Sequence, residues 1–267
     1  VALSAEIVHE GTARVESTYC FPAEIAHGAV QDIFNRHVDY IFLPHFRDME
    51  SYESNTPACF CPITQSLPYY IRKAFPEIPE DKYLAPVISF MYGLQKAAEP
   101  FIAMAVKLGI PESDAQKAFH IAHEKQKECF KKFSQLGQLA IENARKSQTP
   151  VIAVLGRPYN SFTPDANMGI PRKYTSRGYT VIPFDILPFD DQGIYPNMYW
   201  YYGQQDMKAA ALLKNQDNIF VTYISNFSCA PDSFMLHYLK WMMGMKPFLI
   251  LELDSHTADA GVDTRIE

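Results

Sequence analysis

One run of apolar residues constrains the fold more than any other stretch of the chain. Val151 to Leu155 contains no polar side chain and ends at Gly156. A strand that is apolar on both faces is typical of a parallel sheet, which helices cover on both sides. Segments of helical spacing follow and alternate with further apolar runs at 179–183, 219–224 and 248–253. This alternation predicts a parallel, doubly wound sheet in the second half.

The first half repeats this alternation less cleanly. Short apolar runs at 38–43 and 86–91 predict strands, and the polar stretch 45–60 predicts a long loop. Helical spacing covers 94–108 and resumes over 111–147. We therefore expect an α/β fold: two doubly wound, Rossmann-like parallel-sheet domains joined by long helices, with a cleft between them. The expected bounds are 1–93 for the first α/β domain, 94–149 for the helical connector and 150–267 for the second α/β domain.

Three cysteines stand where helices are predicted to begin. Cys20 lies two residues before Pro22, Cys61 directly before Pro62, and Cys229 two residues before Pro231. Proline favours the first helical turn, where its missing N–H would have no partner anyway. The backbone N–H groups at a helix start favour an anion, here the thiolate that binds metals or attacks electrophiles.

The alternative for each cysteine is a small buried apolar residue, the usual role of a lone cysteine. The three cysteines are too far apart in the sequence for a compact zinc or ferredoxin motif, so only folding could bring them together. Cys59 is the reserve for Cys61, which is favoured because Pro62 gives it the helix-start position. For Cys129, beside the apolar stripe of the long helical segment, packing is the better interpretation.

Polar residues also follow two predicted strands of the second half. Arg157 and Asn160 come after Gly156, and His256 lies with Asp254 and Asp259 in a polar loop after the last apolar run. Ligands bind at the carboxyl edge of doubly wound sheets, so Arg157, Asn160 and His256 are possible ligand-loop residues. A salt bridge for Arg157, and helix capping or loop hydrogen bonding for the acidic loop, are the structural alternatives.

Composition narrows the functional classes. The chain has 267 residues, a formal net charge of −6 and scattered basic residues, which argues against nucleic acid and anionic membranes as partners. We expect no signal peptide, because no such pattern opens the given sequence, and no run is long and apolar enough to span a membrane. Five cysteines, an odd number, suit a reduced compartment. We therefore expect a cytoplasmic protein. Because the sequence starts at Val1, we also expect it to be a piece of a longer polypeptide, with its first domain truncated at the N-terminus.

Several motifs resemble one known family. They are Cys20–Gly28, Tyr40–His45, Cys61–Gln65, Leu155–Asn160, Asn226–Phe234 and Leu251–Gly261. Together they are similar to a poorly characterised domain of the large fused activases of 2-hydroxyacyl-CoA dehydratases. That domain is related to the dehydratase subunits and to double-cubane-cluster proteins, which place an iron–sulfur cluster in the cleft between two α/β domains.

The resemblance implies a [4Fe–4S]-type cluster on Cys20, Cys61 and Cys229, either single or part of a double cubane. Three protein ligands would leave one iron open, so such a cluster would be lost from protein prepared in air. The implied partners are ATP-binding activase modules, in the same polypeptide or a partner chain, and an acyl-CoA dehydratase. No nucleotide-binding loop motif occurs in this chain.

The expected function is therefore low-potential electron transfer in an ATP-dependent activase system, as a redox domain of a larger system rather than a complete enzyme. Two alternatives remain open. The chain could be a catalytically silent scaffold within a fused activase, or it could hold a structural zinc ion on the same cysteines.

Overall fold

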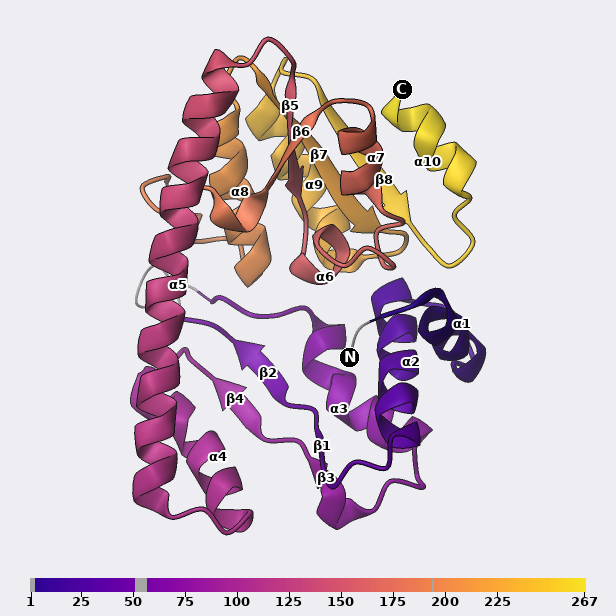
Figure 1. The fold of residues 1–267 in the computed structure, drawn as a ribbon, viewed down its shortest axis with the longest axis vertical. Coiled ribbons are helices and arrows are strands. Elements are labelled where there is room, and N and C mark those ends of the chain that lie inside the picture. The colour runs from indigo at the N-terminus through magenta and orange to yellow at the C-terminus, as the bar shows by residue number, and fades with distance from the viewer. Residues whose placement is uncertain (1–2, 51–56, 194) are drawn as a thin grey trace. The chain divides into compact units, whose positions relative to one another are not determined.

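The computed structural model is built of helices and parallel strands and describes residues 3–50, 57–193 and 195–267 (Figure 1). The α-helices are α1 (Ala5–Arg14), α2 (Phe21–Asn35), α3 (Pro62–Ala74), α4 (Leu94–Lys107), α5 (Glu112–Lys146), α6 (Pro158–Ser161), α7 (Ile170–Ser176), α8 (Tyr201–Leu213), α9 (Ala230–Met243) and α10 (Asp259–Ile266). The strands are β1 (Ile41–Phe42), β2 (His45–Asp48), β3 (Tyr83–Leu84), β4 (Val87–Ser89), β5 (Val151–Leu155), β6 (Thr180–Pro183), β7 (Ile219–Asn226) and β8 (Phe248–Leu253). The α/β class with parallel sheets is confirmed.

The chain packs into two compact units. Unit 1 contains residues 1–31, 133–195 and 202–267, and unit 2 contains residues 32–132 and 196–201. Helix α5 therefore belongs to unit 2 up to Lys132 and to unit 1 from Phe133. The domain bounds predicted from the sequence, 1–93, 94–149 and 150–267, stay a prediction.

Unit 1 is built on a four-stranded sheet with the order β6-β5-β7-β8, and all of its strands are parallel. Val151 pairs with Thr180 on one side and with Ile219 on the other, which places β5 inside the sheet. Every residue of β5 is buried, as expected for a parallel strand with both faces covered. The parallel pairing predicted for the strands of the second half of the chain is confirmed.

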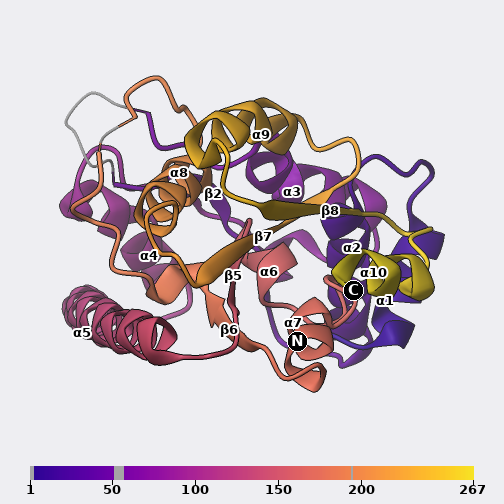
Figure 2. The same ribbon diagram turned by 90° about the horizontal axis from the view of Figure 1, so that it is seen from above.

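Helices cover both faces of this sheet. α8 and α9 lie on one face, and α7 and α10 lie on the other (Figure 2). Ile152 and Val154 of β5 pack with Ile170 and Tyr174 of α7 and with Val262 of α10. The two-residue alternation of a strand sends the other β5 side chains towards α8 and α9.

Unit 2 has two short pairs of parallel strands. β1 pairs with β3, and β2 pairs with β4. Between the pairs, Leu43 N donates to Leu84 O at 2.8 Å and His45 N donates to Pro86 O at 2.9 Å, so the chains stay side by side. Pro44 and Pro86 supply no N–H here, which explains why each ladder is interrupted at this point.

Several elements differ from the sequence prediction. Strand β2 lies within the predicted loop 45–60, of which 51–56 fall outside the described residues. The helical spacing of the sequence predicts a helix over 198–213, whereas α8 begins at Tyr201. Helix α10 begins at Asp259, inside the polar loop predicted after the last apolar run. Helix α1 was not predicted, because its apolar pattern is weak.

Close packing against α2 explains why α1 forms although its own apolar pattern is weak. Ser4 is its N-cap and accepts a hydrogen bond from Ile7 N at 3.3 Å. The helix crosses α2 where two glycines meet: a Cβ on Gly28 would lie 1.9 Å from Ile7 O, and one on Gly11 would lie 2.1 Å from Glu24 O. This packing supplies the stability that the local sequence lacks.

Every helix within residues 3–50, 57–193 and 195–267 falls short of the length or the apolar character that a membrane span requires.

Candidate functional site at the edge of the unit 1 sheet

Cys229 lies in the turn between β7 and α9, at the carboxyl edge of the unit 1 sheet. Ser228 adopts a left-handed conformation with φ +63°, and Cys229 is the N-cap residue of α9 with φ −72°. The Cys229 carbonyl accepts a hydrogen bond from Ser233 N at 2.9 Å, and Pro231 stands in the first turn. The predicted helix-start position of Cys229 is confirmed.

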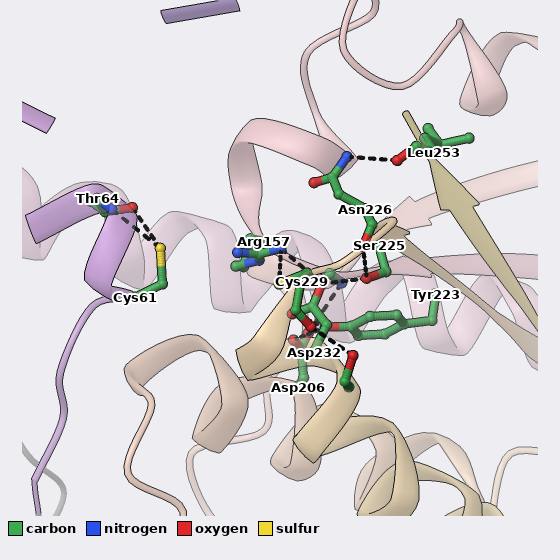
Figure 3. A network of polar contacts seen from close by, with 12 residues as sticks. Cys61, Thr64, Arg157, Asp206, Tyr223, Ser225, Asn226, Cys229, Asp232 and Leu253 are labelled. Atoms are coloured by element: carbon green, nitrogen blue, oxygen red, sulfur yellow. Dashed lines mark hydrogen bonds and ion pairs between the residues drawn. The ribbon is translucent and has the colours of Figure 1, made fainter. Parts of the chain in front are cut away.

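The side chain of Arg157 reaches the sulfur of Cys229 (Figure 3). Its Nη2 donates to Cys229 Sγ and to Asp232 Oδ2, both at 2.8 Å. Arg157 follows β5 and Asp232 lies in the first turn of α9, so the pair links the loop after β5 to the helix that follows β7. A hydrogen bond from a charged donor is stronger on a thiolate than on a thiol, so this contact favours the anionic sulfur.

Arg157 is a buried, fixed cation. Only 5% of Arg157 and 3% of Asp232 are exposed. Burial alone would lower the pKa of Arg157, but the charges of Tyr159, Asp232 and Cys229 outweigh it and raise that pKa well above its usual range. The guanidinium carbon also lies 5.0 Å from the ring centroid of Tyr159. A buried cation of this kind is stable only while its anionic partners stay in place.

Further buried side chains extend this pair into a network (Figure 3). Asp232 Oδ2 accepts from Ser225 Oγ at 2.6 Å, and the Tyr223 hydroxyl lies 3.3 Å from Asp232 Oδ1. The same hydroxyl lies 3.2 Å from Asp206 Oδ2, while Gly156 N donates to Asp206 Oδ1 at 3.2 Å. Burial, followed by the charge of Asp232, raises the pKa of Asp206 to about 8.

Sequence reasoning missed Asp206, Tyr223, Ser225 and Asp232. The sequence contained a weak signal: Asp206 interrupts the apolar positions of α8, and Ser225 continues β7 directly after its apolar run. Polar residues in such buried positions almost always have hydrogen-bond partners. The sequence could indicate that partners were needed, but it could not indicate which residues they are.

The network lies at the topological switch point of the unit 1 sheet, where the order in which strands are added reverses. β6 adjoins β5 on one side and β7 adjoins it on the other, so the chain extends the sheet first one way and then the other from β5. In open parallel sheets, ligands bind outside the carboxyl ends of the strands at such a switch point. Arg157 follows β5 and Cys229 follows β7, the two strands that flank the switch.

Gly156 lets the loops after β5 and β7 approach each other. It adopts φ +123°, and a Cβ at this position would lie 2.3 Å from Ile224 O. The predicted ligand-loop residue Asn160 is fully buried beside it, and neither amide atom of its side chain has a hydrogen-bond partner among the described residues. The same holds for Ser161 Oγ. The edge thus holds buried polar groups with unused hydrogen-bonding capacity.

Cys20 lies directly before α2, and its carbonyl accepts from Ala23 N at 2.9 Å and from Glu24 N at 3.1 Å. Its predicted helix-start position is confirmed. Phe21 of the same turn packs with Ala166, which lies beyond β5.

Glu24 ties α2 to the loop after β8. Its side chain forms a hydrogen bond with Ser255 and lies near the charges of His256 and Asp254, while burial raises its pKa. The start of α2, which Cys20 directly precedes, therefore packs against the same sheet edge as the loops after β5 and β8.

Cys61 belongs to unit 2, where it is the N-cap residue of α3. Its Sγ accepts from Thr64 N at 3.3 Å and lies 3.1 Å from Thr64 Oγ1. Cys59 is held differently: its N–H and C=O bond to Tyr199 O and Tyr201 N, and a hydrogen bond to Cys59 raises the pKa of Tyr199. Cys61 therefore has the predicted helix-start geometry and Cys59 does not.

The acidic loop after β8 has a structural role. Asp254 Oδ1 accepts from His256 N at 2.9 Å and from Thr257 Oγ1 at 2.8 Å. Asp259 forms an ion pair with Lys173 at 2.7 Å. These contacts agree with the loop-bonding alternative, and a ligand role for His256 stays a prediction.

The predicted ligands come from both units: Cys20 and Cys229 from unit 1 and Cys61 from unit 2. None of the five cysteines is in a disulfide, and each is half-buried. Within the described parts of the chain, no group of three or more His, Cys, Asp or Glu side chains is placed to hold a metal ion. The cysteine set stays a prediction.

Comparison with known proteins gives one finding. Residues 2–187 match the family described as "CoA enzyme activase uncharacterised domain". The matched range contains Cys20, Cys61 and Arg157, and Cys229 lies beyond it. No curated protein and no solved structure matches the chain.

Proposed function

Because this chain belongs to the family of CoA enzyme activase uncharacterised domains, we propose that it is the redox module of an activase system for CoA enzymes. In this proposal Cys20, Cys61 and Cys229 hold a [4Fe–4S]-type cluster in a cleft between two Rossmann-like domains. The module receives electrons from an ATP-driven activase partner and passes them to a CoA enzyme such as an acyl-CoA dehydratase.

One observation carries the proposal: the Cys229 sulfur is held at 2.8 Å by a buried guanidinium, at a helix start and beside the switch point of a parallel sheet. A structural cysteine in an apolar core needs none of these features. Together they favour a thiolate at the edge where such sheets bind ligands.

The donor set suits an iron–sulfur cluster. All three residues are thiols at helix starts and are half-buried rather than sealed in a core. Backbone N–H groups at helix starts, and Arg157 at Cys229, can donate hydrogen bonds to sulfur and thereby stabilise negative charge on it. A cluster bound there would supply reversible one-electron chemistry at low potential.

Residues of α1 and α2 hold Cys20 in place at the sheet edge. Glu24 and Phe21 hold the start of α2 against the sheet edge, and the tight α1–α2 crossing at Gly11 and Gly28 fixes the helix. The proposal requires Cys61, at the start of α3, to approach this edge from unit 2.

The test is anaerobic purification followed by iron and sulfide analysis. We expect about four irons and four sulfides per chain for a single cubane. Cys20→Ser, Cys61→Ser and Cys229→Ser should each lose the cluster absorbance, because each removes a thiolate ligand. The matched control is Cys129→Ser in α5, which should keep it.

The alternatives give different results in the same experiment. Zinc at about one ion per chain would support a structural zinc site on the same cysteines. Protein without iron, sulfide or zinc, when kept reduced and free of oxygen, would support a scaffold role in the activase. Equal loss of absorbance in Cys229→Ser and Cys129→Ser would contradict the ligand assignment.

A further inference from the structure

The Tyr223 hydroxyl lies between two buried carboxyl groups, and this geometry limits where the protons can be. Its oxygen is 3.2 Å from Asp206 Oδ2 and 3.3 Å from Asp232 Oδ1 (Figure 3). A phenol carries one proton, so it cannot give a full hydrogen bond to each of two carboxylates. If both aspartates were ionised, two buried like charges would face this one hydroxyl, which disfavours the doubly ionised pair. This arrangement favours a neutral acid at one of the two aspartates.

The remaining contacts of the two aspartates indicate which of them is the neutral acid. Asp232 is ion-paired with Arg157 at 2.8 Å and accepts from Ser225 Oγ at 2.6 Å, and both contacts favour the carboxylate. Asp206 is 1% exposed and makes no ion pair among the described residues, where its other oxygen accepts from a backbone N–H at 3.2 Å. Burial without a counter-ion disfavours the charged form, so Asp206 is the neutral acid.

Groups from every neighbouring element act on Asp206. They are Tyr223 of β7, Asp232 of α9, Arg157 after β5 and Tyr202 of its own helix. Burial first, and then the charge of Asp232, raise the pKa of Asp206 to about 8, although the hydrogen bonds to Asp206 and the charge of Arg157 act in the opposite direction. The geometry and the electrostatics agree that Asp206 is protonated near neutral pH.

We propose that Asp206 is the proton store of the Cys229 site, holding a proton that compensates negative charge arriving at the sulfur. The link runs from Asp206 through Tyr223 to the Asp232–Arg157 pair, which contacts Cys229 Sγ. Asp206 acts through these residues and is a positioning residue, not a ligand. The source of the charge, one electron from an activase partner, rests on the proposed function.

The step balances in charge and atoms. Below about pH 8, Asp206 already holds its proton, so a centre at Cys229 takes up one electron and no proton. At higher pH Asp206 is ionised, and each electron is accompanied by one proton from solvent, which forms the Asp206 O–H bond. No other bond forms or breaks. Each pH unit above this point should make reduction about tenfold less favourable, until reduced protein also loses the proton.

The first arm of the test uses metal-free protein and does not depend on the proposed function. The infrared carbonyl band of protonated carboxyl groups is recorded near neutral pH for wild type, Asp206→Asn and the exposed control Asp217→Asn. Asn is nearly isosteric with a protonated Asp and can keep both contacts. We expect Asp206→Asn to lose one band component that Asp217→Asn keeps, and wild type to lose it as pH rises through about 8. Identical bands in wild type and Asp206→Asn would overturn the proposal.

Tyr223→Phe provides a second variant in case Asp206→Asn does not fold. The carboxylic acid then has no phenol to donate to, so its carbonyl band should remain but shift. An unchanged band would show that Asp206 does not donate to Tyr223 and would overturn the relay.

The second arm uses cluster-loaded protein and follows the reduction potential with pH. Wild type should show a potential that is constant below about pH 8 and falls above it, while Asp206→Asn should show no such fall. The same pH dependence in both would overturn the coupling. Failure to load any iron would overturn the proposed function and the coupling with it, whereas the infrared result would still establish Asp206 as the protonated group.

Discussion

Cys229 and Cys61 occupy the same local position, before a proline-initiated helix, but their surroundings differ. Cys61 Sγ caps α3 through Thr64 N at 3.3 Å and contacts the Thr64 hydroxyl at 3.1 Å, both local neighbours. Cys229 Sγ accepts a hydrogen bond from the buried guanidinium of Arg157, which is 72 positions away in the sequence. The contacts described for the two sulfurs therefore differ: a local cap at Cys61, and a buried charge network at Cys229.

This difference shows what a helix start does and does not provide. The local sequence places a thiol before a helix in both units, and backbone N–H groups follow in both. At Cys229 the unit 1 sheet adds a fixed charge, because its strand ends bring together loops that are distant in sequence. Substitutions around Cys229 should therefore lower the free energy of unfolding strongly, and those around Cys61 should lower it only slightly.

The largest effect is expected from Asp232→Ala, which leaves the Arg157 guanidinium buried without its carboxylate. Removing one partner of a buried ion pair typically costs about 3–5 kcal/mol in the free energy of unfolding. Urea unfolding followed by circular dichroism measures this cost. Ser233→Ala, at an exposed position one residue further along α9, is the matched control and should cost under about 1 kcal/mol. An equal loss of unfolding free energy in the two variants would contradict a stabilising charge network at Cys229.

The pH dependence of stability should differ between wild type and Asp206→Asn. The folded-state pKa of Asp206 is raised to about 8, above its ordinary value of 3.8, so its contribution to stability is complete at low pH. That contribution falls as pH rises between these values, by about 1.4 kcal/mol per pH unit.

Asp206→Asn lacks this titration, so its free energy of unfolding should rise relative to wild type as pH increases from about 5 to 8. Urea unfolding at several pH values measures the difference. A constant difference across this range would contradict a protonated Asp206.

Glycine substitutions sharpen the comparison of backbone packing. Gly156→Ala should destabilise the protein by about 3 kcal/mol, because its Cβ would lie 2.3 Å from Ile224 O at φ +123°. Gly109→Ala in unit 2 also has a positive φ, +85°, but its Cβ would meet no atom within 4 Å. That variant should cost only about 1 kcal/mol. Thermal unfolding of the two proteins side by side tests whether the close approach at Gly156 matters.

The smallest effect is expected at Cys61. Thr64→Val removes the hydroxyl next to Cys61 Sγ but keeps the backbone N–H that the sulfur caps, so the metal-free protein should lose about 0.5–1 kcal/mol. Cys61→Ser should be nearly neutral in the same protein, because serine is a good N-cap. A loss of several kcal/mol in either variant would show that Cys61 also depends on a charged environment.

The sequence predicted most of the elements that position the site. The strand from Val151 to Leu155, the helices after Cys61 and Cys229 and the long helix α5 follow from apolar periodicity and proline positions. The parallel sheet of unit 1 follows from their alternation. These features depend on local pattern, and local pattern is what a sequence displays.

The charge network depends on contacts between distant residues and could not be predicted. Arg157, Asp206 and Asp232 belong to three different elements and meet only when β5 and β7 become neighbours. Helix α1 was missed for a related reason, because its packing against α2 at Gly11 and Gly28 is tertiary. A single sequence shows each of these residues but not its partner.

The most direct test of the account is electron paramagnetic resonance of the reduced, anaerobically loaded protein. Wild type should give the signal of a reduced [4Fe–4S] cluster, Cys129→Ser should keep it, and Cys229→Ser should lose it. Arg157→Gln, which removes the charge beside the sulfur, should shift the signal or the potential at which it develops. No signal from wild type, or the same signal from wild type and Cys229→Ser, would contradict the account.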